Sequence, residues 1–237
     1  LMHPALRFLT ALALGLASAC SPSEYGGASQ VSVETSEPSS KGVLALSVLT
    51  MTNPFFIEIA EHFTEEAKKN GYETLVVSGE KDVAQQQNQV KDFIVREVAA
   101  IVLCPCDSKS IGPAIQEANE AGIPVFTADI ACLAPGAEVV SHIATDNYDG
   151  GKKAGEAMIE ALGDAGGQVV ILDYKSAESC LLRVDGFKEV LSAHNGNAAN
   201  PPIEIVAELP GEGSRELGFQ VTEDALQAHP NLAGIFA

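Results

Sequence analysis

Basic residues are scarce in this chain, and their scarcity excludes one broad class of partner. The 237 residues include 14 Lys and Arg against 32 Asp and Glu, so that the formal net charge at pH 7 is −18. A chain of this charge repels phosphate backbones, and we therefore expect no nucleic-acid partner. The acidic residues are spread along the sequence, which is typical of a well-solvated surface.

Signatures of catalysis are also missing. The sequence contains no G-x-S-x-G nucleophile motif, no phosphate-binding G-x-x-x-x-G-K-[ST] loop and no G-x-G-x-x-G after the first expected strand. Its histidines are scattered, at positions 3, 62, 142, 194 and 229. We therefore expect no enzymatic activity, no cofactor and no metal site.

Cysteines are few, and the sequence does not decide whether they are free thiols, disulfide-bonded or metal ligands. After Cys20 the chain has Cys104, Cys106, Cys132 and Cys180. Cys104 and Cys106 form a C-P-C arrangement, which is too tight for the usual zinc knuckle. An even number in an exported protein permits disulfides. The alternatives are buried or loop thiols, which we favour, a disulfide, or a metal site.

The first 20 residues are similar to an export signal. A weakly basic start precedes the apolar run 8–16, which is shorter than the about 20 residues needed to span a bilayer. Small residues at 17–19 precede Cys20, as at a signal cleavage site and in the lipobox of bacterial lipoproteins. We expect residues 1–20 to be a signal peptide ending in lipidation of Cys20. Simple cleavage or an uncleaved anchor are the alternatives, because Ala17 replaces the usual Leu.

Residues 21–41 predict a flexible tether. They are rich in Ser, Gly and Glu and carry almost no apolar period. A tether behind a lipid anchor holds a domain near a membrane, so we expect a periplasmic or extracytoplasmic location.

From residue 42 onward, short apolar runs alternate with amphipathic stretches. Strands are expected at residues 43–49, 73–78, 99–103, 123–128, 139–145, 168–174, 203–209 and 232–237. Helices are expected from Pro54 after an Asn53 cap, and at residues 83–97, 111–122, 148–162, 181–193 and 215–228. Apolar strands that alternate with helices predict an α/β fold with parallel sheets covered on both faces.

Both ends of the chain are unusual. The last residues belong to the apolar run 232–237, with no loop behind it, and Leu1 stands before Met2. A protein rarely ends on a core strand that it has just begun. We therefore expect the chain to lack the C-terminal part of a longer protein.

Polar side chains that follow the strands predict a binding site, because parallel α/β sheets bind ligands beyond the carboxyl ends of their strands. Asp129 offers a charged acceptor to two adjacent hydroxyls, and Arg183 offers a planar fork of donors. Asn53 can donate and accept, and Phe55 or Phe56 can stack on the apolar face of a sugar ring. Together they suit a polyhydroxylated ligand.

Each of these residues also has a purely structural interpretation. Phe56 recurs at helical spacing and suits the core. Asp129 could cap the following turn, and Asn53 could serve only as a helix N-cap. Arg183 could pair with an acidic residue of its own helix.

Several segments, in order, resemble the ribose-binding protein and its relatives, which are type I periplasmic binding proteins of ABC transporters. The segments are TNPFF (52–56), AGIPVFTAD (121–129), VVSHIATDN (139–147), GGKKAG (150–155) and RVDGF (183–187). The likeness runs from about Gly42 to Ala237.

The resemblance implies two Rossmann-like lobes with parallel sheets, an N-terminal lobe at 42–144 and an incomplete C-terminal lobe at 145–237. Asp146 and Asn147 would form part of the hinge between them, at the first crossing of the chain. The ligand would bind between the lobes, which close around it.

The resemblance also places the five candidate residues at sugar-contacting positions. Three positions depart from ribose-binding members: Leu49 replaces a polar residue, Ile130 replaces a second Arg, and Gly213 replaces an aromatic residue. Fewer polar groups argue against ribose itself and for a larger, less polar or modified sugar.

The function implied is an extracytoplasmic solute-binding protein that captures a sugar or sugar-like ligand and delivers it to an ABC transporter permease. A sensor that presents a sugar to a membrane chemoreceptor or kinase is the alternative. Sugar-responsive transcription regulators share this fold, but they need a helix-turn-helix segment where an export signal stands here.

Overall fold

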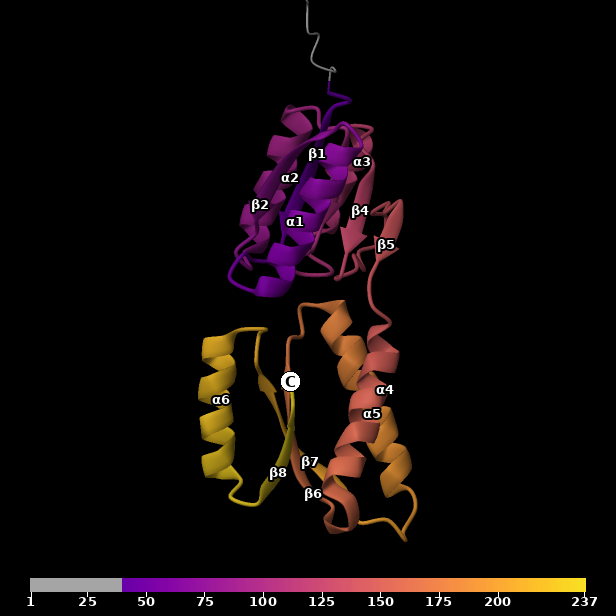
Figure 1. The fold of residues 1–237 in the computed structure, drawn as a ribbon, viewed down its shortest axis with the longest axis vertical. Coiled ribbons are helices and arrows are strands. Elements are labelled where there is room, and N and C mark those ends of the chain that lie inside the picture. Colours follow the sequence, from indigo (N-terminus) through magenta and orange to yellow (C-terminus); the bar gives the residue numbers. More distant parts are fainter. Residues whose placement is uncertain (1–39) are drawn as a thin grey trace, which may run out of the picture. The chain divides into compact units, whose positions relative to one another are not determined.

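The computed structural model describes residues 40–237. The expected signal peptide, Cys20 and nearly all of the expected tether therefore lie outside the described residues. The described part forms two separate parallel sheets with helices packed against them (Figure 1). This confirms the predicted α/β class with two Rossmann-like sheets. No helix in residues 40–237 is both long and apolar enough to cross a membrane.

The first sheet has the strand order β2-β1-β3-β4-β5, and every neighbouring pair is parallel. Its strands are β1 (Val43–Val48), β2 (Glu73–Ser78), β3 (Ala100–Leu103), β4 (Val125–Ala128) and β5 (Ser141–Ile143). Because all strands run in one direction, their carboxyl ends meet at the same edge. The edge strand β5 is shorter than the predicted run 139–145 and is exposed along its length.

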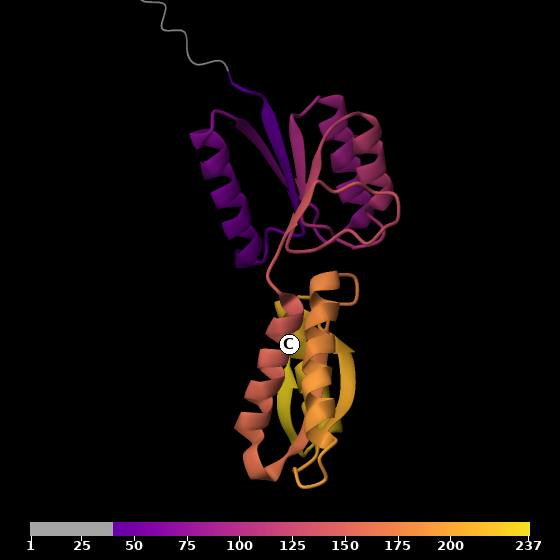
Figure 2. The ribbon, with the colours of Figure 1, turned by 90° about the vertical axis from the view of Figure 1, so that its right-hand side faces the viewer.

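Helices cover both faces of this sheet, and the sheet with its helices is called the first lobe below. The helices are α1 (Pro54–Lys69), α2 (Val83–Val95) and α3 (Gly112–Glu120). Figure 2 shows α1 on one face, with α2 and α3 on the other. Successive side chains of β1 point to opposite faces, so Ala45 packs with Phe93 of α2 while Leu46 packs with Phe56 of α1. Both faces are thus buried, as the near-continuous apolar strands predict.

The loop between β1 and α1 has the predicted cap. Asn53 has an extended backbone, and its Oδ1 accepts a hydrogen bond from the Phe55 N–H at 3.0 Å. Pro54 occupies the first helical position, where its missing N–H costs nothing. After the helix, Gly71 takes a φ of 81°, which is readily adopted by glycine. The helix is therefore fixed at both ends by its own sequence.

The second lobe is built in the same way around the strand order β7-β6-β8. Its strands are β6 (Gly167–Asp173), β7 (Ile203–Pro210) and β8 (Leu232–Phe236). Its helices are α4 (Asn147–Leu162), α5 (Glu178–Asn195) and α6 (Arg215–Ala228), with a short 3₁₀ turn, η1, at Gly163–Ala165. In Figure 1, α4 and α5 run side by side on one face of the strands and α6 lies on the other. The core of this lobe contains Val169, Phe187 and Leu191.

Helices α4 and α5 approach closely because glycines stand where they cross. A Cβ atom on Gly151 would overlap the carbonyl oxygen of Arg183, and one on Gly186 would overlap that of Tyr148. The first turn of α4, which contains Asn147, is consequently held against the turn of α5 that carries Arg183.

Helix α5 begins at Glu178 rather than at Leu181, because its cap comes from the first lobe. Its own N-cap residue, Ala177, makes no side-chain cap hydrogen bond. Instead, Ser108 Oγ accepts a hydrogen bond from the Glu178 N–H at 3.0 Å, and the Ser108 N–H donates to the Ser176 carbonyl at 2.9 Å. Ser108 and Glu178 are 70 residues apart, so the local sequence could not predict the added turn.

Candidate functional site

A cavity of about 290 Å³ is lined by residues of both lobes, from loops that follow strands and from the first turns of α1 and α5. We call it the inner cavity. All five predicted residues line it: Asn53, Phe55, Phe56, Asp129 and Arg183. The three positions that depart from ribose-binding members, Leu49, Ile130 and Gly213, line it as well. The structure therefore brings together residues that are far apart in the sequence, although their contact with a ligand stays a prediction.

Asp129 lies directly after β4 in an unusual backbone conformation. Its φ is 63°, a value that non-glycine residues adopt rarely and that Asp tolerates better than most. Its N–H donates to the Ile143 carbonyl at 2.9 Å, which holds this conformation against β5. Burial raises the pKa of the Asp129 carboxyl, and the positive charges of Arg183 and His142 oppose that rise. The carboxylate is thus a poorly solvated acceptor that a hydroxyl donor would satisfy.

Arg183 is held by a residue that the sequence marked only as part of a hinge. Its Nε donates to Asn147 Oδ1 at 2.8 Å, and Asn147 is buried at the start of α4. The alternative that Arg183 pairs with Asp185 or Glu189 of its own helix is not observed, because no ion pair within residues 40–237 includes Arg183 and Glu189 pairs with Lys152. The terminal nitrogens of Arg183 are left for the cavity.

Asn53 and the two phenylalanines form the first-lobe side of the inner cavity. Asn53 Oδ1 is used as the helix cap, so its Nδ2 is left as the donor. Phe56 is 4% exposed and belongs to the core of the first lobe, as its helical spacing predicts. Phe55 is 50% exposed and meets Phe56 edge to face, with ring centroids 5.2 Å apart. Phe55 is therefore the ring with a face open to a ligand.

The inner cavity also has residues that the sequence analysis did not name as candidates for ligand binding. They are Thr50, Tyr174, Ala177, Ser179 and Cys180. Tyr174 stands just after β6 and Thr50 soon after β1. Because parallel α/β sheets bind ligands beyond the carboxyl ends of their strands, both residues could have been predicted. Burial raises the pKa of Tyr174 to about 12, and its hydroxyl donates to the Cys106 carbonyl at 3.2 Å.

The cysteines within residues 40–237 are all free thiols. Cys104 and Cys106 are buried, and burial raises the pKa of both, that of Cys106 to about 12. Such thiols stay protonated and unreactive at neutral pH. The observation favours the interpretation as buried or loop thiols over a disulfide.

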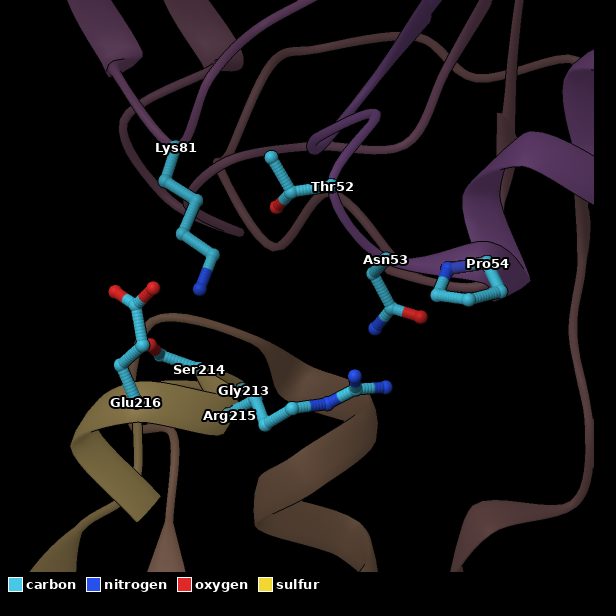
Figure 3. Close-up of a pocket in the computed structure, with 8 residues that line it drawn as sticks. All are labelled: Thr52, Asn53, Pro54, Lys81, Gly213, Ser214, Arg215 and Glu216. Carbon is cyan, nitrogen blue, oxygen red and sulfur yellow. The ribbon is translucent and has the colours of Figure 1, made fainter. Parts of the chain in front are cut away.

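A second cavity, of about 400 Å³, adjoins the inner one (Figure 3). We call it the outer cavity. It shares Asn53 and Gly213 with the inner cavity, and Thr52, Pro54, Lys81, Ser214, Arg215 and Glu216 complete its lining. Lys81 Nζ donates to the Glu212 carbonyl at 2.7 Å, which links the first lobe to the second.

The arrangement is suited to binding. Acceptor, donors and an aromatic face converge from two lobes on one cavity, and the nucleophile–base pairs that catalysis needs do not appear among its lining residues. The model of the periplasmic binding protein domain matches residues 44–237 of this chain. The chain belongs to the periplasmic binding protein family.

Relatives within the family are named as ribose import binding proteins. The ribose import binding protein RbsB of Escherichia coli (strain K12) is 34% identical over 197 residues, which cover 83% of this chain and 64% of that protein. RbsB of Bacillus subtilis (strain 168) is 30% identical and covers 100% of this chain and 73% of its own length. The predicted membership among ribose-binding-like periplasmic binding proteins is thereby confirmed.

A solved structure agrees with this assignment. It is an ABC transporter periplasmic solute binding protein from Actinobacillus succinogenes 130z with bound D-allose, with a TM-score of 0.71 and 30% identity. The match covers 83% of this chain and 68% of that one. This chain spans 64% of the length of the Escherichia coli relative.

Proposed function

We propose that the protein binds a sugar or sugar-like ligand between its two lobes and delivers it to an ABC transporter permease. One observation carries the proposal: the inner cavity, which combines the Asp129 carboxylate, the Arg183 guanidinium and the exposed Phe55 ring. Two adjacent hydroxyls of a sugar can form hydrogen bonds with a carboxylate or a guanidinium, and the C–H face of the sugar can stack on an aromatic ring. The sugars named for the relatives support the same chemistry.

The proposal extends to the motion of the lobes. Residues 42–144 and 145–237 would close around the ligand, with Asp146 and Asn147 at the hinge. Asp146 caps α4 by accepting a hydrogen bond from the Asp149 N–H at 3.0 Å, and Asn147 is bonded by Arg183. A ligand that contacted Arg183 would therefore be linked to the chain crossing between the lobes by a single hydrogen bond, the one from Arg183 to Asn147.

Export and membrane attachment belong to the same proposal. We infer that residues 1–20 are removed as a signal peptide and that Cys20 carries a lipid, which would hold the lobes near the permease by the tether at 21–41. Metabolic labelling with a radioactive fatty acid tests this. Label in the wild-type protein and none in Cys20→Ser supports the lipid anchor, whereas label in neither leaves simple cleavage or an uncleaved anchor.

Calorimetric titration with a panel of monosaccharides tests the binding function. For a sugar that binds, Asp129→Ala should weaken binding by about 1.5–3 kcal/mol, because a charge-assisted acceptor is lost. Asp224→Ala, which removes an exposed carboxylate from α6, is the matched control and should leave the affinity unchanged. The role of Asp129 is rejected if its variant binds as the wild type does, and the function is rejected if no sugar binds.

A further inference from the structure

The outer cavity and the inner cavity adjoin at Gly213, which has no side chain to separate them. Gly213 lines both, and a Cβ placed there would meet no atom closer than Tyr174 Cδ1, at 4.0 Å. The junction is therefore open on the Gly213 side. A ligand held in the inner cavity has about 400 Å³ of further space beside it.

Cationic side chains from both lobes line the outer cavity. Lys81 reaches it from the loop after β2, and Arg215 reaches it from the start of α6 (Figure 3). Neither forms an ion pair with a carboxylate of residues 40–237; the acidic member of the lining, Glu216, lies beyond 4.0 Å of both. In a chain with 14 basic and 32 acidic residues, two such cations line the same cavity.

Arg215 is the first helical residue of α6, where the helix dipole disfavours its positive charge, and Glu216 of the same turn partly offsets that cost. The same dipole and the N–H groups of that first turn favour a negative group in front of the helix. Lys81 uses one N–H donor on the Glu212 carbonyl, so its other donors are left for the cavity.

We propose that the outer cavity is a subsite for an anionic substituent, so that the ligand is a sugar that carries a carboxylate or a phosphate. The sugar ring occupies the inner cavity and the anion lies between Lys81 and Arg215. This subsite rests on the proposed function and specifies its substrate class. It agrees with the expectation of a larger or modified sugar and departs from that of a less polar one.

Paired ligands test the subsite by calorimetric titration of the full gene product. The pairs are D-galactose with D-galacturonate, for a carboxylate, and D-ribose with D-ribose 5-phosphate, for a phosphate. At least one anionic member should bind more than about tenfold more tightly than its neutral parent, since charged hydrogen bonds are the strong ones. The pair that shows the preference identifies the anion.

Variants locate the effect. Arg215→Gln should lower the preference for the anionic member by about tenfold or more, while Arg96→Gln, which removes an exposed charge at the end of α2, should leave it unchanged. Lys81→Gln provides a second, independent loss, and thermal melting confirms that each variant folds.

The outcomes separate the two proposals. If a neutral sugar binds and its anionic counterpart binds no better, the subsite is rejected and the proposed function stands. If the preference survives both Arg215→Gln and Lys81→Gln, the anion is bound elsewhere and the subsite is again rejected. If no sugar, neutral or anionic, binds, the proposed function fails and the subsite fails with it.

Discussion

Asp129 illustrates the competing demands on the residue that we propose as a ligand acceptor. Its carboxylate is partly removed from water, its backbone has a φ of 63°, and its pKa is raised by burial. Each of these features disfavours the folded protein without a ligand. The same features leave an acceptor with little competing solvent, which strengthens a hydrogen bond from a sugar hydroxyl.

The raised pKa of Asp129 leads to a pH-dependent prediction. Because the folded-state pKa lies above the unfolded one, the group favours the folded state at low pH, and this contribution is lost as pH rises through the folded pKa. Asp129→Asn should therefore raise the melting temperature of the ligand-free protein at about pH 7, and the advantage should shrink towards about pH 4. Thermal melting across this range, with Asp224→Asn as the control, checks it. If the melting temperatures of Asp129→Asn and the wild type differed by the same amount at both pH values, the prediction would be wrong.

The crossing of α4 and α5 determines where Arg183 lies. Gly151 and Gly186 allow the helix backbones to touch, and this contact brings Asn147 within 2.8 Å of Arg183 Nε. The guanidinium is therefore aimed by helix packing as well as by its own rotamer. If Arg183 binds the ligand as proposed, its placement depends on Gly151 and Gly186, which line neither cavity.

Adjacent glycines of α4 give a matched test of this packing. A Cβ on Gly150 meets nothing within 4 Å, whereas one on Gly151 would overlap the Arg183 carbonyl. Gly151→Ala should lower the free energy of unfolding by about 1–3 kcal/mol through overpacking, while Gly150→Ala should raise it by up to about 1 kcal/mol through helix propensity. Urea denaturation measures both. Equal effects of the two substitutions would show that the helices separate freely.

The elements were predictable wherever their causes are local. The strand at 73–78 and the helix at 215–228 have the predicted bounds, because apolar period and a Ser214 cap determine them. The start of α5 was not predictable, since its cap is Ser108 of the other lobe. Likewise, Asp129 and Arg183 could be named from strand ends, but the hydrogen bond of Arg183 to Asn147 depends on a helix crossing that no spacing reveals.

Direct hydrogen bonds join the two lobes of the molecule beside the inner cavity. Ser108 bonds the start of α5, Tyr174 bonds the Cys106 carbonyl, and Lys81 bonds the Glu212 carbonyl. If the lobes close around a ligand as proposed, these bonds would contribute to the free energy of closure, and ligand binding would supply only the rest.

Removal of the Ser108 hydroxyl should favour the open form. Ser108→Ala leaves the first turn of α5 without its cap, and we expect it to weaken sugar binding by about 0.5–2 kcal/mol, the usual cost of a lost cap. Calorimetry gives the affinity, and small-angle X-ray scattering of the ligand-free protein should show a larger radius of gyration. Thr64→Ala, which removes a hydroxyl bond inside α1, should change neither. A weaker affinity with an unchanged radius would assign Ser108 to helix stability alone.

The lining of the inner cavity has a consequence for how such a protein changes over evolutionary time. Asn53, Asp129, Tyr174 and Gly213 all lie after strands, in loops, while Ala45, Leu46 and Val169 hold the sheets. Asn53, Asp129 and Gly213 lie outside the buried core, whereas Leu49, Phe56, Ile130 and Tyr174 both line the cavity and pack in the core, so ligand choice is only partly separate from folding. Ligand specificity can therefore change through a few substitutions in the loops while the sheets stay the same.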